Sequence, residues 1–356
     1  MTQPEMPILE SPNCPLPIAD RGQIVLGHGS GGLMTHDLIR DVFQSRLSNL
    51  ILNSANDAAK ITEAPPGKHL VISTDAHIIF PLFFAGGDIG RLAVCGTVND
   101  VAMLGAEPRF LTATFILEEG FAINELEMVI DSFAEACQEA GVELIAADTK
   151  VTEKGKSDKL FISTTGFGWA DSNLRIGGEQ AKPGDAVIIS GPVGNHGVAV
   201  AEARGNLGFS SQVRSDIAPL NHMVKALLDA GLDVHVLRDP TRGGLATTLV
   251  EIARQSGVNI ELDEEKIPVD KPVLKTCELL GLDPLYMANE GKLILILPTN
   301  QAEDALRIMR STLYGEQARL IGQVLEPSKG QIWLKTPFGT TRVLEMLAGE
   351  MLPRIC

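Results

Sequence analysis

Residues 87–104, GDIGRLAVCGTVNDVAML, are the stretch that decides the fold. Apolar residues recur there at helical spacing, which predicts a helix with one apolar face. Segments rich in Thr, Ile, Val and Phe surround this helix and have the composition of β-strands. They are LVISTDAHIIF (70–80), PRFLTATFIL (108–117), VELIAADTKV (142–151) and KLFISTTGFGWA (159–170). A second helix is predicted over 123–140, before Gly141. The first half is therefore predicted to be an α/β domain.

The second half repeats this style after a polar, turn-rich stretch, DSNLRIGGEQAKPGD (171–185). That composition is typical of a linker, so we place a domain boundary near Gly178. Strands are predicted for AVIISG (186–191), VNIELD (258–263) and KLILILP (292–298), and helices over 197–204, 245–257 and 302–311. A chain of 356 residues exceeds what one core usually organises, so two α/β domains are expected.

Composition excludes several classes of function. The formal charge of −15 disfavours a nucleic-acid partner, because that affinity rests on Lys and Arg. The sequence has no apolar run of the roughly 18 to 20 residues that would span a bilayer, and its start does not resemble a signal peptide. Five widely spaced cysteines fit neither a disulfide framework nor a zinc site. We therefore expect a soluble protein of the reducing cytoplasm.

A glycine-rich motif, GHGSGG (27–32), lies between a short apolar run and a predicted helix. Its residues His28, Gly29, Ser30, Gly31 and Gly32 could hold phosphate, because glycines let backbone N–H groups approach it and a helix N-terminus adds positive charge. The motif matches neither a P-loop nor a Rossmann fingerprint. An ordinary glycine turn is the alternative.

Four aspartates lie at predicted element ends with apolar neighbours: Asp57, Asp75, Asp100 and Asp148. A carboxylate in such surroundings is unfavourable unless it is paired or binds a cation, and Mg²⁺ prefers carboxylate oxygens and bridges to phosphates. Lys150 lies two residues after Asp148, on the same face of a strand, where it could contact a phosphate. Helix capping and turn formation are the alternatives for each aspartate.

The second half offers further candidates. Arg238 and Arg242 lie near a Gly-Gly pair in LRDPTRGGLATTLVE (237–251), an arrangement that suits an anion, and SGPVGNHG (190–197) is a similar glycine loop. Glu290 comes directly before a predicted buried strand, where desolvation would raise its pKa toward that of a useful base. A tight turn and a solvent-facing glutamate are the respective alternatives.

The last residue, Cys356, follows the segment AGEMLPRI. A proline three residues from the end prevents a helix, so we predict a mobile tail with an exposed, reactive thiol. Chance occurrence is the alternative. By contrast, Cys95, Cys137 and Cys277 lie in apolar helical patterns and are predicted to be buried.

In combination these motifs resemble the HypE family of hydrogenase maturation factors, which are carbamoyl dehydratases. The resemblance runs from about residue 23 to residue 356 through GHGSGG, STDAHIIFPLFFAGGDIG, CGTVNDVAMLGAEPR, DTKV, RDPTRGG, ANEG and the closing PRIC. Two positions depart from the family pattern, Ala147 and Asn195. More distantly, the chain is similar to aminoimidazole ribonucleotide synthase, selenophosphate synthetase and thiamine-monophosphate kinase.

The resemblance implies a fold and a division of the chain. It implies an α/β (α+β) protein with an N-terminal mixed-sheet domain that pairs in a homodimer, and a C-terminal α/β sandwich domain like that of aminoimidazole ribonucleotide synthase. We assign residues 1–22 to an N-terminal extension, 23–178 to the ATP-binding and dimerisation domain, 179–345 to the C-terminal domain, and 346–356 to the tail.

It also implies a reaction, in which ATP drives dehydration of a carbamoyl group on Cys356 to a thiocyanate that supplies cyanide to iron. Asp75, Asp100 and Asp148 would hold Mg²⁺, and Glu290 or Lys150 would act as the base. The glycine motif, Asp57, Asn99 and Arg242 complete the expected ATP site. The implied partners are the carbamoyltransferase HypF and the HypC–HypD complex, which assembles the iron-cyanide group.

Two other functions fit part of the sequence. One is a kinase or synthase of the same superfamily that acts on a free small molecule, and the other is a thiol carrier without ATP chemistry. The fate of a carbamoyl group on Cys356 in the presence of Mg-ATP distinguishes them, because only the dehydratase removes one water from it.

Overall fold

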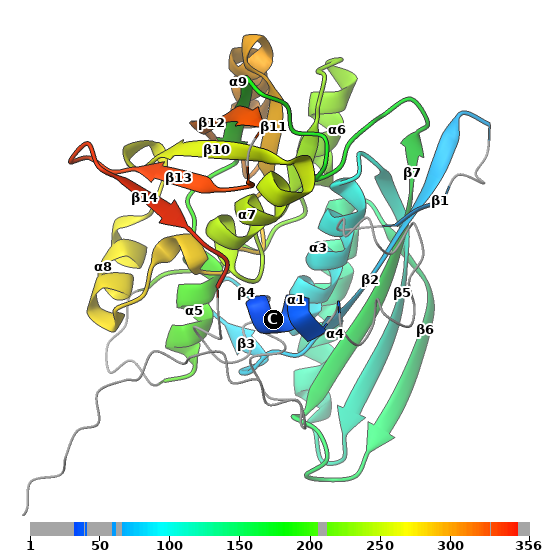
Figure 1. Ribbon diagram of the computed structural model, residues 1–356. Coiled ribbons are helices and arrows are strands. Elements are labelled where there is room, and N and C mark those ends of the chain that lie inside the picture. Colours follow the sequence, from blue (N-terminus) through cyan, green and yellow to red (C-terminus); the bar gives the residue numbers. More distant parts are fainter. Residues whose placement is uncertain are drawn as a thin grey trace, which may run out of the picture.

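The computed structural model describes residues 32–38, 40, 59–61, 66–205, 212–327 and 329–347. Its strands form a five-stranded sheet in the N-terminal half, a seven-stranded sheet in the C-terminal half and a two-stranded ribbon at residues 83–88, within the N-terminal half. The helices α3 and α4 lie against one face of the five-stranded sheet, and α3 lies between this sheet and the C-terminal half (Figure 1). The mixed α/β fold with two domains is thus confirmed.

The N-terminal sheet has the strand order β1-β2-β7-β5-β6. Only the β5–β6 pair is parallel, because α4 connects these two strands; the other pairs are antiparallel. The elements of this half are α1 (Leu33–Leu38), β1 (Ala59–Ile61), β2 (Lys68–His77), β3 (Phe83–Phe84), β4 (Gly87–Asp88), α3 (Ile89–Ala102), β5 (Glu107–Glu118), α4 (Ile123–Ala140), β6 (Glu143–Thr152) and β7 (Leu160–Asp171).

Helix α3 forms the core of this domain. Asp88 caps its start, because the carboxylate accepts hydrogen bonds from the backbone N–H groups of Gly90 and Arg91. Twelve of its fourteen residues are buried, since the helix is packed between the sheet, α4 and the C-terminal half. Gly105, with φ of 72°, allows the chain to turn directly into β5.

The C-terminal sheet has the order β14-β13-β10-β12-β8-β11-β9, with a parallel pair between β10 and β13. Its strands are β8 (Asp185–Ile189), β9 (Val236–Arg238), β10 (Val258–Asp263), β11 (Ile294–Pro298), β12 (Arg319–Pro327), β13 (Ile332–Lys335) and β14 (Thr341–Leu344). Its helices are α5 (Asn195–Ala203), α6 (Asn221–Asp229), α7 (Gly244–Ser256), α8 (Lys271–Leu280), α9 (Ala302–Ser311) and the 3₁₀ turns η4 (Glu264–Lys266), η5 (Pro284–Tyr286) and η6 (Thr299–Gln301). Every residue of β8 is buried because helices cover both faces of the sheet centre.

Polar contacts fix the two halves to each other. Arg91 of α3 donates to Glu139 of α4 at 2.7 Å and to the Ile217 carbonyl of the C-terminal half at 3.3 Å. The hydroxyl of Tyr314, after α9, donates to the other oxygen of Glu139. Asn221, at the start of α6, donates to the Ala140 carbonyl at 2.8 Å. The relative position of the halves is therefore specified by side chains as well as by apolar packing.

Most predicted elements occur near their expected bounds, and α4 and α9 coincide with the predicted ranges. The three cysteines expected to be internal, Cys95, Cys137 and Cys277, are buried, and burial raises the pKa of each thiol. The N-terminal extension and residues 348–356 of the predicted tail lie outside the described residues, so the mobility of the tail and the domain bounds stay predictions.

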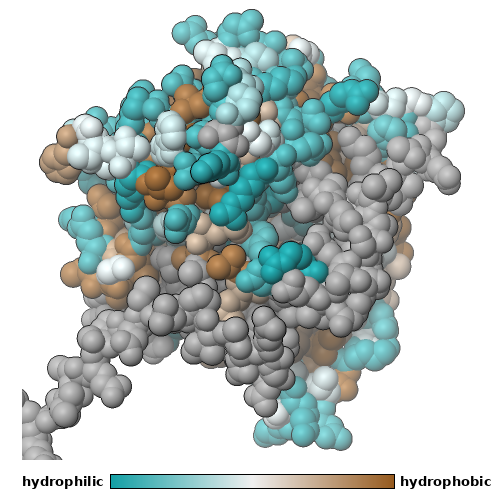
Figure 2. All heavy atoms as spheres, in the orientation of Figure 1, coloured by the Kyte–Doolittle hydropathy of each residue, from teal (hydrophilic) through white to brown (hydrophobic). Residues whose placement is uncertain are grey.

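Among the described residues on the face drawn in Figure 2, hydrophilic residues predominate and hydrophobic ones appear in groups between them. Within the described ranges, no helix combines the length and the apolar character needed to cross a membrane.

Candidate active site

Glu290 lies in the irregular segment between η5 and β11, and it is buried. Burial raises the pKa of its carboxyl well above the usual range, and the charges of Asp239, Asp75 and Asp216 raise it further, whereas Arg242 lowers it. Its Oε1 atom has no hydrogen-bond partner within the described residues. A buried carboxyl with high proton affinity and an unpartnered oxygen is suited to accept a proton from a substrate.

Two further acids, Asp239 and Asp75, belong to the same cluster. Asp239, which follows β9, is buried, and desolvation raises its pKa to about 6 although Arg238 opposes this shift. Asp75 also raises the pKa values of both Asp239 and Glu290. Carboxylates whose charges raise the pKa values of Glu290 and Asp239 make this a site with an excess of negative charge, which a cation or a proton would stabilise.

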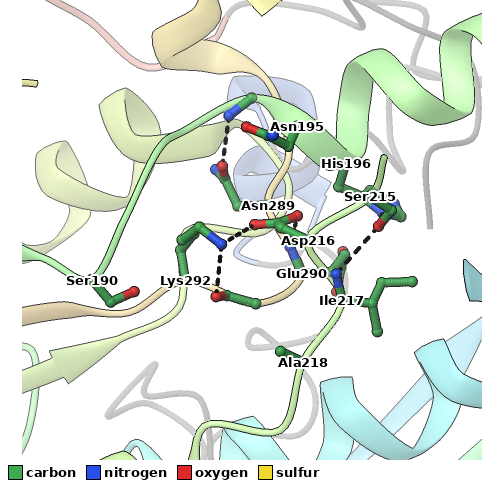
Figure 3. A network of polar contacts seen from close by, with 12 residues as sticks. Ser190, Asn195, His196, Ser215, Asp216, Ile217, Ala218, Asn289, Glu290 and Lys292 are labelled. Atoms are coloured by element: carbon green, nitrogen blue, oxygen red, sulfur yellow. Dashed lines mark hydrogen bonds and ion pairs between the residues drawn. The ribbon is translucent and has the colours of Figure 1, made fainter. Parts of the chain in front are cut away.

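Figure 3 shows the polar contacts around Glu290. Lys292 Nζ lies 3.1 Å from Asp216 Oδ2 and donates to the Gly291 carbonyl at 3.1 Å. Asp216 Oδ1 accepts the backbone N–H of Glu290 at 3.2 Å. Asn289 accepts the Gly194 N–H at 2.7 Å, so the predicted glycine loop 190–197 is held beside the Glu290 segment.

Asp75 and Asp100 lie on the facing surfaces of β2 and α3. Asp100 Oδ2 accepts a 2.8 Å hydrogen bond from Ser73, which lies on the same face of β2 as Asp75. Asp75 Oδ2 is close to Gly96, one helical turn before Asp100. This pair fits Mg²⁺, an ion usually bound through one or two carboxylates together with waters and substrate phosphates.

Asp148 lies elsewhere in the same protomer. The β2–β7, β7–β5 and β5–β6 registers place Ala147 opposite Asp75 across three strand spacings, about 14 Å. Asp75 and Ala147 point to the helix-covered face, so Asp148 points to the other face. The structure therefore brings Asp75 and Asp100 together and does not bring Asp148 to them within one chain.

Lys150 and Asp148 share one exposed face of β6, as predicted. Lys150 Nζ donates to Asp148 Oδ2 at 2.7 Å, and this bond lowers the pKa of the Asp148 carboxyl. All residues of β6 from Glu143 to Val151 are exposed, and β6 is the edge strand of its sheet.

Two predicted ATP-site residues differ in exposure, since Asn99 is buried and Arg242 is exposed. Asn99 is buried, and its side-chain amide donates to the Ala218 carbonyl at 3.0 Å and accepts the Leu220 N–H at 2.8 Å. It thus joins α3 to the C-terminal half, and its role toward ATP stays a prediction. Arg242 is exposed, and its positive charge lowers the pKa values of both Glu290 and His77, so it lies near the acidic cluster.

Gly32 is the one residue of the glycine motif within the described ranges, directly before α1. A Cβ there would collide with the carbonyl oxygen of Leu347, so glycine is required for this close approach. The other predicted residues lie outside the described residues: His28, Gly29, Ser30, Gly31, Asp57 and Cys356.

Sequence reasoning missed four polar residues of this site: His77, Asp216, Asp239 and Lys292. His77 is buried on β2 with its Nε2 atom 3.7 Å from Asp75 Oδ2, and burial lowers its pKa. Asp239 and Lys292 lie inside or beside the motifs RDPTRGG and ANEG, which could have indicated them. Asp216 lies in an irregular segment that carries no sequence signal.

Comparisons with known proteins agree with this architecture. The family model of the AIR synthase related protein, N-terminal domain, matches residues 55–170, and that of the C-terminal domain matches residues 182–335. The carbamoyl dehydratase HypE of Azotobacter vinelandii is 50% identical over 335 residues, which are 94% of this chain and 98% of that protein. The chain belongs to the HypE family of carbamoyl dehydratases.

Solved HypE structures have the same fold. HypE in a HypE–HypF complex superposes with a TM-score of 0.82 at 46% identity, over 87% of this chain and 99% of the other. HypE in complex with ATP superposes with a TM-score of 0.79 at 48% identity, over 94% and 100% of the two chains. The resemblance seen in the sequence motifs is thereby confirmed over both domains.

Proposed function

We propose that this HypE-family chain is an ATP-dependent carbamoyl dehydratase, which converts an S-carbamoyl group on its own Cys356 to a thiocyanate and so supplies the cyanide ligand of [NiFe]-hydrogenase iron. The observation that carries the proposal is the buried Glu290 carboxyl, whose Oε1 is unpartnered within the described residues and whose pKa is raised. A dehydration that removes two amide protons needs such a base.

The proposed dehydration consumes one ATP and releases ADP and phosphate. The carbamoyl oxygen attacks the γ-phosphorus of ATP, ADP leaves, and the amide nitrogen loses one proton. The C–O bond of the phosphorylated intermediate then breaks, the second N–H proton is lost, and a C≡N bond remains on sulfur. ADP and phosphate are the other products, and phosphate and solvent take the two protons. Phosphorylation is needed because an amide oxygen is otherwise a poor leaving group.

Each residue of the site has a separate role in the proposed reaction. Glu290 receives the amide protons and passes them to phosphate and solvent, and Arg242, near the acidic cluster, orients an incoming phosphate. The glycine motif before α1 holds phosphate through backbone N–H groups, with Asp57 and Asn99 completing the ATP site. Asp75 and Asp100 would hold Mg²⁺, which neutralises triphosphate charge when bound.

We further propose that the protein acts as a homodimer with composite sites. The exposed edge strand β6 carries Leu144, Ile145 and Val151 on its surface, an edge that normally needs covering. A second copy at this edge would bury these side chains. Because Asp148 and Lys150 cannot reach Asp75 within their own chain, they would serve the site of the other protomer.

The partners and the compartment follow from the chemistry. Cys356 must receive its carbamoyl group from a carbamoyltransferase, and the solved HypE–HypF complex supports HypF as this partner. The HypC–HypD complex would take the cyanide for iron. The use of ATP and of a reduced thiol supports the cytoplasm as the compartment of this reaction.

ATP turnover tests the proposal. The chain, HypF, carbamoyl phosphate and Mg-ATP are combined, and ADP formed by the chain is measured against the amount of carbamoylated Cys356. Stoichiometric ADP that is lost in Cys356→Ala supports the dehydratase. Stable carbamoylation without ADP would make the chain a carrier, and turnover that persists in Cys356→Ala would indicate a free small-molecule substrate.

A further inference from the structure

Asp216 and Lys292 form a buried ion pair directly beside Glu290. Their side chains are 5% and 10% exposed, and the 3.1 Å separation of Lys292 Nζ from Asp216 Oδ2 leaves no room for water between them. Figure 3 shows Asp216 between the side chain of Lys292 and the backbone of Glu290. An ion pair without an evident function is unexpected at such a depth, because both charges lose their hydration.

We propose that Asp216, held in place by Lys292, is the positioning residue for Glu290 in the dehydration. The proposal rests on Glu290 acting as the base of the proposed function. Asp216 Oδ1 accepts the Glu290 N–H at 3.2 Å, and the Glu290 carbonyl accepts the Ala218 N–H at 3.3 Å. Both backbone groups of Glu290 are therefore bound to one segment, residues 215–218.

Residues 215–218 leave no space for a side chain at position 291. A Cβ on Gly291 would collide with the Asp216 carbonyl oxygen and would contact Ala218. The close approach places the Asp216 carboxylate against residues 290 and 292 together. Glycine at position 291 is thus explained by packing against Asp216.

The same segment is fixed to the N-terminal half. The Ser215 N–H donates to the Ala85 carbonyl at 2.7 Å, Arg91 donates to the Ile217 carbonyl, and Asn99 donates to the Ala218 carbonyl. Through these bonds, α3 and the loop before it determine where the Glu290 backbone lies. The base is consequently tied to the N-terminal half, to which Asp75 and Asp100 belong.

The pair also adjusts the charge around Glu290. The charged groups that act on this carboxyl are Asp239 after β9, Asp75 on β2, Asp216 and Arg242, and Lys292 balances Asp216. Removing the Asp216 charge would lower the pKa of Glu290 and leave Lys292 to stabilise the carboxylate. Removing the Lys292 charge would raise the pKa of Glu290, because Asp216 would then be uncompensated.

The proposal is tested by the acidic midpoint of the pH profile, which should shift in opposite directions in two variants. Single-turnover dehydration of carbamoylated protein is measured across pH in Asp216→Asn and Lys292→Met. Protonation of Glu290 is followed separately by infrared difference spectroscopy on the ATP-free proteins. The Glu290→Gln variant identifies the infrared band of this carboxyl. We expect Asp216→Asn to move the acidic midpoint down and Lys292→Met to move it up, each by on the order of one pH unit. The plateau rate should fall about three- to tenfold in both variants. In the double variant the midpoint should return toward the wild-type value.

Several outcomes would overturn the proposal. Midpoints that stay at the wild-type value, or that move in the same direction in both variants, would reduce the pair to a structural ion pair. If the melting curve of Asp216→Asn shows that this variant does not fold, the shift of the pH midpoint in Lys292→Met alone tests the proposal. Wild-type protein that loses no water in the presence of ATP would instead refute the proposed function, and the infrared titration would still report whether the pair controls Glu290.

Discussion

The backbone N–H of Leu33 donates a 2.7 Å hydrogen bond to the carbonyl oxygen of Leu347, and this bond joins the first turn of α1 to the segment after β14. Two neighbouring contacts hold the same segment: Tyr286 donates to the Glu345 carbonyl at 2.8 Å, and Arg254 contacts Met346 Sδ at 3.0 Å. In Figure 1 the chain runs from β14 past α7 toward α1. The base of the tail is thus attached beside the predicted phosphate motif.

The attachment limits where the thiol can go. Cys356 follows Leu347 by nine positions, so an extended chain carries it at most about 30 Å from this point. Tyr286→Phe removes only the bond to the Glu345 carbonyl. We expect about two- to tenfold slower dehydration of the carbamoyl group on Cys356, from the loss of one hydrogen bond that orients the tail.

The control is Thr299→Val, which removes a comparable 2.5 Å bond to the Gly184 carbonyl, away from the tail. Dehydration of a separate carbamoylated peptide ending in PRIC should be equally fast in wild type and Tyr286→Phe. An equal loss with this peptide would mean that Tyr286 acts on the site itself.

Glu290→Gln should reduce dehydration by about 10² to 10⁴, the usual contribution of a general base, while ATP binding remains. The variant should also become more stable than wild type as the pH rises above the ordinary pKa of a glutamate, because burial disfavours the ionised Glu290 carboxylate. Single-turnover rates, ATP titrations and melting temperatures measure these effects. Full dehydration in Glu290→Gln would leave Lys150 as the candidate base.

Asp239 should make the protein less stable as the pH rises. Its pKa is raised to about 6 in the folded state, so its contribution is fully present below its unfolded pKa and is lost as pH rises through about 4 to 6. Urea unfolding across this range should show a smaller decline in Asp239→Asn than in wild type. Parallel curves for the two proteins would show that Asp239 is ionised as easily as in the unfolded chain.

Composite sites predict complementation between inactive variants. Asp75→Asn and Asp148→Asn should each abolish or strongly reduce dehydration. In a dimer of one Asp75→Asn chain and one Asp148→Asn chain, one composite site carries both substitutions and the other carries neither. Activity should therefore reappear after subunit exchange. Two copies of Asp75→Asn distinguished by different tags serve as the control. Mixtures that stay inactive, although mixed dimers form, would place all three aspartates in one chain's site.

The sequence determines the fold better than it determines the site. The helices α4 and α9 were predictable because their apolar residues repeat over several turns, whereas β9, β13 and β14 were missed because each has only three or four residues. Glu290 and Asp75 were proposed from short motifs near strand ends. These motifs carry local chemistry, so a single sequence is sufficient to propose such residues.

The strand order could not be predicted from the residues. Asp75 and Asp148 both lie in predicted strands, but only the order β2-β7-β5-β6 shows that they are three strands apart on opposite faces. Asp216 was missed for a related reason. It lies in an irregular segment, where tertiary contacts rather than periodicity determine burial.

The mass of the C-terminal peptide tests the central claim most directly. Protein carbamoylated on Cys356 is mixed with Mg-ATP, quenched and digested, and the peptide ending in PRIC is weighed by mass spectrometry. The dehydratase account predicts that the carbamoylated peptide loses the mass of one water, only with ATP present and with Glu290 intact. A carbamoyl group that keeps its full mass while ATP is bound and available would contradict it.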